Sequence, residues 1–367
     1  MTSLDGRLLE PTNTDASRVS RSSHAGVAAT RLTPAWLGGA LAVTLGAVLV
    51  GALVGPAGLP AGDVVAELAD AIPFVNVPSS LTEQQAAVLW MIRLPRVVLG
   101  LLVGAALAAS GAAYQGVFRN PLADPYLLGA AAGAGLGATL AIVAGLNDLP
   151  AAVPAAAFAG AGVAVAATWA MGRTVGGRSI TSVILAGVAV ASFLTALQTF
   201  VQQRNVETLR EVWSWILGSL ATATWDDVVL ILPWFAISLA GLLVHRRHLD
   251  VLSVGEEEAA GLGINAPRVR TVIVVAATAA TAAAVAVSGL IGFVGIIVPH
   301  TIRLLAGGTY RRVLPLAVLG GGAFLVLADV LARLLMSPAE LPIGVVTAFF
   351  GAPFFAVVLR RSTRAAA

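Results

Sequence analysis

Four charged side chains lie inside or beside long apolar runs, where a charge needs a partner. Arg93 and Arg96 are separated by two residues, and Asp329 precedes Arg333 by four. A charge at the centre of a bilayer costs about 2.5–3.5 kcal/mol on insertion scales. The i, i+4 spacing places Asp329 and Arg333 on one helix face and predicts an internal ion pair. Arg93 and Arg96, taken alone, are typical of side chains that reach from a helix end to the membrane interface.

The sequence holds no motif for catalysis or for a resident metal ion. HExxH and GxSxG are absent, and the four histidines have no metal-ligand spacing. There is no cysteine, which excludes a thiolate site. All 22 basic residues are arginine, so the Walker A lysine that holds ATP phosphates is missing. We therefore expect no catalytic residue, metal or cofactor in this chain. If ATP drives the protein, ATP-Mg binds a partner ATPase.

The composition places most of the chain in a membrane. It is 58% hydrophobic and 11% charged, against roughly 25% charged residues in soluble domains. The apolar residues come in long runs, which makes the bilayer their natural solvent. The net charge of +3 comes from arginines at the ends of these runs and forms no basic stripe, which argues against nucleic-acid binding. The predicted fold class is an all-α integral membrane protein.

Uncharged stretches of spanning length predict the individual membrane helices. They are Ala35–Val54, Val97–Phe118, Tyr126–Leu146, Ala151–Met171, Ile180–Gln203, Val228–Val244, Val313–Leu335 and Leu341–Leu359, with a longer stretch at Thr271–Pro299. The longer stretch could be one tilted helix or two helices broken near Ser288, Gly289 and Gly292. Arginine-rich ends lie in the cytoplasm, and only two crossings keep the basic clusters on either side of this stretch together. Both termini are also basic and therefore cytoplasmic, so the number of crossings must be even. The sequence thus predicts about ten spans.

The chain divides into a membrane domain and two tails. Residues 1–34 are polar and are expected to form a disordered cytoplasmic tail. The transmembrane domain covers 35–361, and 362–367 form a second cytoplasmic tail. Within the domain, the cytoplasmic segment 250–268 fits a short surface helix, since glycines can end it and acidic residues suit its first turn. Its spacing leaves a solvated loop and a docking helix for a partner equally open.

Several motifs follow one another in a fixed order. They are Arg93-Leu-Pro-Arg96, Arg119-Asn-Pro-Leu-Ala-Asp-Pro125, Gly255-Glu-Glu-Glu-Ala259 with Leu262-Gly263, Val298-Pro-His-Thr-Ile-Arg303, Ala328-Asp-Val-Leu-Ala-Arg333 and Glu340-Leu-Pro-Ile-Gly344. Together they resemble the FecCD family, the permeases of type II ABC importers for iron-siderophores, haem and cobalamin. The likeness covers roughly residues 35–361. It implies the type II ABC importer permease fold, with about ten transmembrane helices per subunit.

The resemblance also implies partners. Two copies form a homodimer around a central path in the inner membrane. Two ABC ATPase subunits dock on the cytoplasmic face, and a substrate-binding protein docks outside. Arg93, Arg96 and Arg333 match external arginines that receive two acidic residues of the binding protein. Exposed guanidiniums there would pair bidentately with carboxylates.

Two further sets of residues take their roles from the same resemblance. Asn120 and Leu122 match one part of a cytoplasmic gate, and Ile180 and Thr181 match the other. The coupling helix, which docks in a groove of the ATPase and passes its closure on as a rigid-body movement, is matched by Gly255, Glu256, Glu257, Glu258, Ala259, Leu262 and Gly263.

Three classes of function are compatible with the residues to different degrees. An importer permease accounts for the motifs, with a ferric siderophore as the substrate most often assigned in the family and haem or cobalamin as alternatives. An ion-coupled secondary transporter usually holds intramembrane carboxylates or histidines, and Asp329 is the clear carboxylate of this kind in the sequence. An intramembrane enzyme is disfavoured because no catalytic motif is present.

Overall fold

Helices make up all the regular structure in the part of the chain that the computed structural model describes, residues 32–149, 151–175 and 180–366. They are α1 (Pro34–Leu53), α2 (Ala61–Asp70), α3 (Glu83–Ala87), η3 (Val88–Arg93), α4 (Leu94–Val117), η4 (Pro125–Leu128), α5 (Ala130–Val143), α6 (Ala152–Val175), α7 (Ile180–Arg204), η5 (Val206–Thr208), α8 (Leu209–Ile216), α9 (Trp225–Val254), α10 (Glu256–Gly261), α11 (Ala266–Ser288), α12 (Val294–Ala306), α13 (Tyr310–Leu334) and α14 (Ile343–Ala366). The predicted all-α class is confirmed. Most of the predicted tail, residues 1–31, lies outside the described residues, and 362–366 continue α14.

The membrane-crossing helices follow the predicted order. Seven helices of the described chain are long and apolar enough to cross a bilayer. Three shorter apolar helices, Ala130–Val143, Val294–Ala306 and Ile343–Val358, occupy the positions of the remaining predicted spans. The chain is therefore a multi-pass membrane protein.

The long stretch that begins at Thr271 is broken, as charge parity required. α11 ends at Ser288 and α12 begins at Val294. Gly289 and Phe293 both have φ of 68°, a left-handed backbone that no helix can continue through. At the buried break, the Tyr126 hydroxyl accepts from Ile291 N–H at 3.2 Å and donates to its carbonyl at 3.0 Å. Irregular backbone at membrane depth needs such partners inside the protein.

Several helix ends differ from the predicted stretches, and α5 and α9 illustrate two reasons. α5 begins at Ala130 instead of Tyr126, because Pro125–Leu128 forms a 3-10 turn and Gly129 is left-handed at φ 81°. α9 runs for 30 residues, well beyond the predicted Val228–Val244. At 1.5 Å per residue that is about 45 Å, longer than the roughly 30 Å hydrocarbon core. Its last turns therefore extend past the apolar region.

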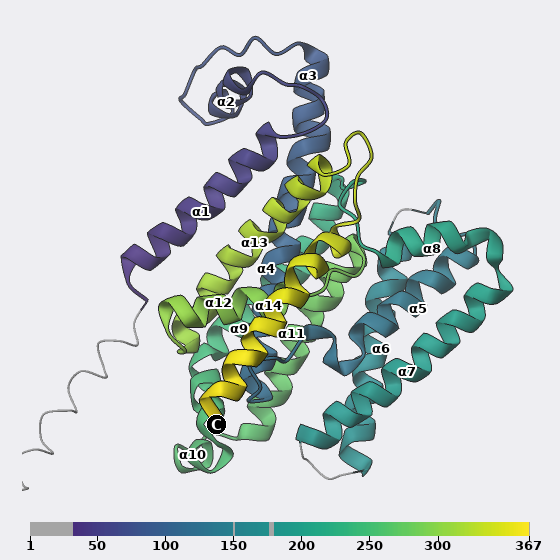
Figure 1. Ribbon diagram of the computed structural model, residues 1–367, viewed down its shortest axis with the longest axis vertical. Helices are drawn as coiled ribbons and strands as arrows, with labels where there is room; N and C mark the ends of the chain where they lie inside the picture. Colours follow the sequence, from purple (N-terminus) through teal and green to yellow (C-terminus); the bar gives the residue numbers. More distant parts are fainter. Residues whose placement is uncertain (1–31, 150, 176–179, 367) are drawn as a thin grey trace, which may run out of the picture.

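α4 is the central helix, buried along nearly its whole length. It packs against α9, α11, α12 and α13, while α5, α6, α7 and α8 form a second group beside them (Figure 1). Glycines allow the closest crossings: a Cβ on Gly104 would lie 2.2 Å from the Gly321 carbonyl oxygen of α13. A Cβ on Gly133 would lie equally close to the Gly160 oxygen of α6. In lipid, where apolar burial gives little drive between helices, such close packing holds them together.

The two ends of the molecule differ. α2 and α3 lie at one end, and α10 lies at the other, near the C-terminal end of α14 (Figure 1). α4 runs between these ends, so Arg93 and Arg96 at its start are far from α10. Arg93 and Arg96 are thus on the opposite side of the membrane domain from the acidic segment Glu256–Glu258 of α10.

Candidate functional site

Arg96 is held between two carboxylates at the α2–α3 end. Its Nη2 lies 2.8 Å from Asp329 Oδ1 of α13 and 2.8 Å from Glu340 Oε2 in the loop after α13. Nε and Nη1 donate further hydrogen bonds to the same two carboxylates. Only 7% of Arg96 and 2% of Asp329 is exposed. Charge-assisted pairs of this kind fix both position and orientation.

Arg333 and Arg93 complete the cluster. Arg333 Nη2 lies 3.1 Å from Asp329 Oδ2, which confirms the predicted i, i+4 ion pair. Its Nη1 donates to the Val54 carbonyl at 2.7 Å, at the end of α1. Arg93 donates to the Ala52 and Leu53 carbonyls at 2.9 and 3.0 Å, and also to the Ala57 carbonyl. We call Arg93, Arg96, Arg333, Asp329 and Glu340 the arginine cluster.

The burial of these three arginines differs from the sequence expectation. We expected exposed guanidiniums, but Arg93 and Arg333 are only 4% and 3% exposed. The expectation was wrong because carbonyls at the end of α1 and carboxylates on α13 and its loop fold over them. Three guanidiniums and two carboxylates still leave the cluster with a formal charge of +1. Glu340 was missed as an ion-pair partner, although it is the only acidic residue between α13 and α14.

The segment between α1 and α4 is held by its own polar contacts. The Glu67 carboxylate on α2 accepts from Ser79 Oγ at 2.5 Å and from Trp90 Nε1 at 3.1 Å. These hydrogen bonds hold the pKa of the Glu67 carboxyl below its ordinary value. Glu67 therefore stays charged and ties α2 to η3, the turn that leads into Arg93.

At the opposite end of the domain, the loop Arg119–Pro125 follows α4, and we call it the motif loop. It carries two of the predicted gate residues. Asn120 is exposed, and its Oδ1 accepts from Leu122 N–H at 2.9 Å, which stiffens the turn. Asp124 is half-buried and accepts from Tyr126 N–H at 2.8 Å, so that it caps η4. Burial raises the pKa of Asp124 to about 6, and the hydrogen bond from Tyr126 only partly opposes this.

The other predicted gate residues begin α7. Thr181 is exposed in the first turn, and Ile180 is the first residue of the helix. α7 meets the chain after the motif loop about two turns further on, where a Cβ on Gly187 would lie 2.3 Å from the Leu127 carbonyl oxygen. α7 therefore contacts η4 two turns beyond Thr181, whereas the loop with Asn120 and Leu122 leads directly into η4. Their joint action as a gate stays a prediction.

The acidic segment forms a separate short helix, as its glycines indicated. α9 ends before Gly255, α10 covers Glu256–Gly261, and Gly263 follows in a left-handed conformation at φ 73°. Ala259 is completely buried, whereas Leu262 is 69% exposed. Glu257 and Glu258 are exposed as well. α10 thus anchors one side to the protein and presents an apolar and acidic surface outward.

A chain of polar contacts, unpredicted from the sequence, runs from the end of α9 to the motif loop. Asp250 Oδ1 accepts from Tyr310 N–H at 2.5 Å, and Tyr310 Oη accepts from Arg303 Nη2 at 3.1 Å. Arg303 also donates to Gln115 Oε1. Gln115 Nε2 in turn donates to the carbonyls of Gly295 and Ala123, at 3.0 and 3.4 Å. The lone glutamine in the apolar run of α4 was the signal for a buried partner.

A family comparison fits this arrangement. The profile of the FecCD transport family matches residues 43–361, nearly the whole described chain. The chain belongs to the FecCD transport family. It is an ABC importer permease of the FecCD type, and the family is a transport component rather than an ATPase.

Relatives and a solved structure agree with this assignment. The permease is 39% identical over 77% of its length to the cobalamin import permease BtuC of Halobacterium salinarum, covering 76% of that protein. It is 37% identical over 77% of its length to the Fe(3+) dicitrate permease FecD of Escherichia coli, covering 89% of that protein. A metal-chelate type ABC transporter solved in an inward-facing conformation matches with a TM-score of 0.76 and 29% identity, covering 90% of this chain and all of the other.

Proposed function

We propose that two copies of this permease form the import path for a ferric siderophore, with haem or cobalamin as alternatives. One observation supports this most directly. The arginine cluster and α10 lie at opposite ends of the membrane domain, as an importer that takes substrate from one side and ATP energy from the other requires. Relatives named for ferric dicitrate and for cobalamin support a metal chelate as the substrate class.

The arginine cluster is the proposed docking surface for the binding protein. Its formal charge of +1 attracts a carboxylate, and Arg93 is its one guanidinium bound to carbonyls alone among the described residues. An acidic side chain of the binding protein would replace the carbonyl contacts of Arg93 with a charge-assisted pair. Arg96 and Arg333 hold Asp329 and so keep the α4 and α13 ends in register.

α10 is the proposed contact with the two ATPase subunits, which hold the ATP-Mg. Its exposed Leu262 and glutamates suit a groove with an apolar floor and a basic rim. Movement of α10 would reach Asp250 at the end of α9, then Tyr310, Arg303 and Gln115. Gln115 holds the motif loop through the Ala123 carbonyl, so the polar chain links the ATPase contact to the proposed gate.

The same proposal includes the orientation of the permease in the membrane and its partners there. The α10 end faces the cytoplasm with both termini, and the arginine cluster faces outward in the inner membrane. The basic residues His245-Arg246-Arg247 near the end of α9 agree with the positive-inside rule. The bilayer, a second copy, the ATPases and the binding protein are the partners, and nucleic acid is not among them.

An ion-coupled secondary transporter has less support. Its proton or ion carrier would be Asp329, yet that carboxylate is bound by both Arg96 and Arg333. A carboxylate committed to two guanidiniums inside the protein is not open to a transported ion.

Substrate identity is tested by competition. The permease is reconstituted with its ATPase and binding protein, and uptake of a radiolabelled ferric hydroxamate siderophore is measured with unlabelled haem or cobalamin in excess. We expect uptake that unlabelled siderophore suppresses and the other two do not. Labelled cobalamin or haem accumulating in place of the siderophore would overturn the siderophore assignment and leave the importer role standing.

A further inference from the structure

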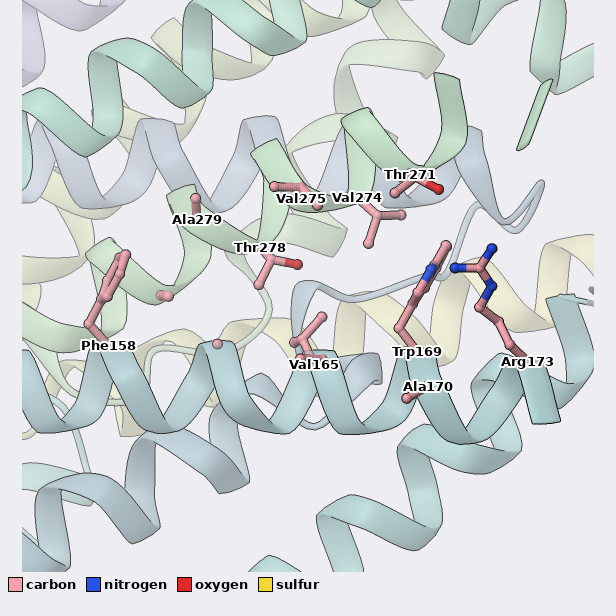
Figure 2. A pocket seen from close by; sticks show the side chains of 13 residues that line it. Phe158, Val165, Trp169, Ala170, Arg173, Thr271, Val274, Val275, Thr278 and Ala279 are labelled. Carbon is pink, nitrogen blue, oxygen red and sulfur yellow. The ribbon is translucent and has the colours of Figure 1, made fainter. Parts of the chain in front are cut away.

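A groove lies between α6 and α11 (Figure 2). Its volume is about 480 Å³, within the roughly 300–1,000 Å³ range of small-molecule sites. On α6 it runs from Phe158 to Arg173, and on α11 from Thr271 to Ala282. The α6 side is about 22 Å long at 1.5 Å per residue. That exceeds half of the roughly 30 Å hydrocarbon core, so one lipid chain from one leaflet fits lengthwise.

The walls of the groove are apolar. Its lining includes only two hydroxyl side chains, and both bond within the protein. Thr278 Oγ1 lies 2.6 Å from the Tyr114 hydroxyl, and Thr271 Oγ1 donates to the Pro267 carbonyl at 2.9 Å. A polar ligand would therefore find no partner along the length of the groove.

One end of the groove is polar and positive. Trp169 Nε1 is buried and has no hydrogen-bond partner among the described residues. Arg173, one turn further along α6, is exposed and forms no ion pair with any described carboxylate. Figure 2 shows the indole nitrogen and the guanidinium at the same end, beside Thr271. Arg268, an exposed residue three positions before Thr271, adds positive charge at the start of α11.

We propose that this groove binds an anionic phospholipid from the leaflet on the α10 side. One acyl chain lies between α6 and α11, and the phosphate accepts hydrogen bonds from Trp169 Nε1 and Arg173. An apolar groove with a donor pair at a single end matches an amphipathic ligand with an anionic head. The unpaired indole N–H can donate to a phosphate oxygen, and the local positive charge favours a head with net negative charge over a zwitterionic or neutral one.

Lipid retention by the purified full-length permease tests the proposal. The delipidated protein is given phosphatidylglycerol or phosphatidylcholine with the same acyl chains, and bound lipid is counted by native mass spectrometry. We expect phosphatidylglycerol to be retained about fivefold better, as one basic residue near an anionic head predicts. Arg173→Gln should remove this preference without lowering phosphatidylcholine binding. Trp169→Phe should lower retention of both lipids, because both carry the phosphate that accepts its N–H.

Filling the groove supplies a second test with a matched control. A Cβ on Gly162 meets no atom within 4 Å, so Gly162→Leu with Ala166→Leu can occupy the groove without a clash at residue 162. Gly46 on α1 is equally open, and Gly46→Leu serves as the control. The filled variant should lose bound phosphatidylglycerol, and the control should keep it.

Photoactivatable phosphatidylglycerol decides the matter on the unaltered protein, even if the filled variant fails to fold. Labels on α6 and α11 peptides would support the groove. Labels confined to other helices, equal retention of the two lipids, or full retention by the folded filled variant would overturn the proposal. Protection of the groove by a second copy, seen as labelling that appears only in the dissociated monomer, would also overturn it.

Discussion

Arg96 on α4 and Asp329 on α13 are joined by a buried ion pair with a 2.8 Å contact. The two residues are 233 positions apart in the chain. Asp329 also holds Arg333 at 3.1 Å, so one carboxylate neutralises charge on two helices. The ends of α4 and α13 near α2 and α3 are therefore joined through a single carboxylate.

Replacing Asp329 with asparagine should destabilise the permease strongly. The change leaves Arg333 without a carboxylate, and removing one partner of a buried pair costs roughly 3–5 kcal/mol. Thermal unfolding in lipid nanodiscs measures this as a lowered midpoint. The double variant Asp329→Asn with Arg333→Gln should recover part of the loss, because the orphaned charge is gone. No recovery would show that the pair does not act as a unit.

Arg93→Gln should weaken binding of the substrate-binding protein while leaving the fold intact. Arg93 is held by carbonyls, and glutamine can keep part of those contacts. Loss of one charge-assisted hydrogen bond across an interface corresponds to roughly 1.5–3 kcal/mol, or about 10- to 150-fold in Kd. Binding is measured on nanodiscs by biolayer interferometry. Arg204→Gln, an exposed arginine in the last turn of α7, is the matched control, and unchanged affinity of the Arg93 variant would exclude the docking role.

Tyr310→Phe should uncouple transport from ATP hydrolysis. It removes the hydroxyl that accepts from Arg303 at 3.1 Å but keeps the ring and the N–H bound to Asp250. A single buried hydrogen bond contributes roughly 0.5–1.5 kcal/mol, so we expect the number of substrates imported per ATP to fall several-fold. Arg247→Gln, at an exposed arginine of α9 outside the polar chain, controls for local disturbance. An unchanged ratio of uptake to hydrolysis would show that the polar chain carries no movement.

Gly104→Ala should be costly and Gly46→Ala harmless. A methyl on Gly104 would lie 2.2 Å from the Gly321 carbonyl oxygen, whereas one on Gly46 meets nothing within 4 Å. Forcing α4 and α13 apart costs roughly 1–3 kcal/mol. Unfolding midpoints of the two variants measured side by side give the comparison. Equal midpoints would mean that the helices do not cross this closely.

The spans could be predicted because the bilayer imposes a length and an apolar composition on each one. The break between α11 and α12 was predicted from arginine placement, since basic clusters must share a side. The first and last residues of the helices were harder to predict. α9 continues as a helix past the apolar run, and Gly129 ends a turn that an apolar run alone does not reveal.

The sequence predicted the ion pairs of the site only where the two residues are close together in the chain. Asp329 and Arg333 are four apart on one helix, so their pairing is a local property that spacing reveals. Arg96 and Glu340 are 244 positions apart, and no local pattern joins them. Their pairing depends on how α4 packs against α13, and so does the burial of guanidiniums that we expected to be exposed.

ATP-dependent uptake tests the central claim most directly. Proteoliposomes holding the permease, its ATPase and its binding protein receive radiolabelled ferric siderophore under two conditions. In one, ATP is present on the ATPase side and ionophores abolish every ion gradient. In the other, a proton or sodium gradient is imposed and ATP is absent. We predict accumulation in the first condition alone; accumulation driven by the gradient without ATP would contradict the account.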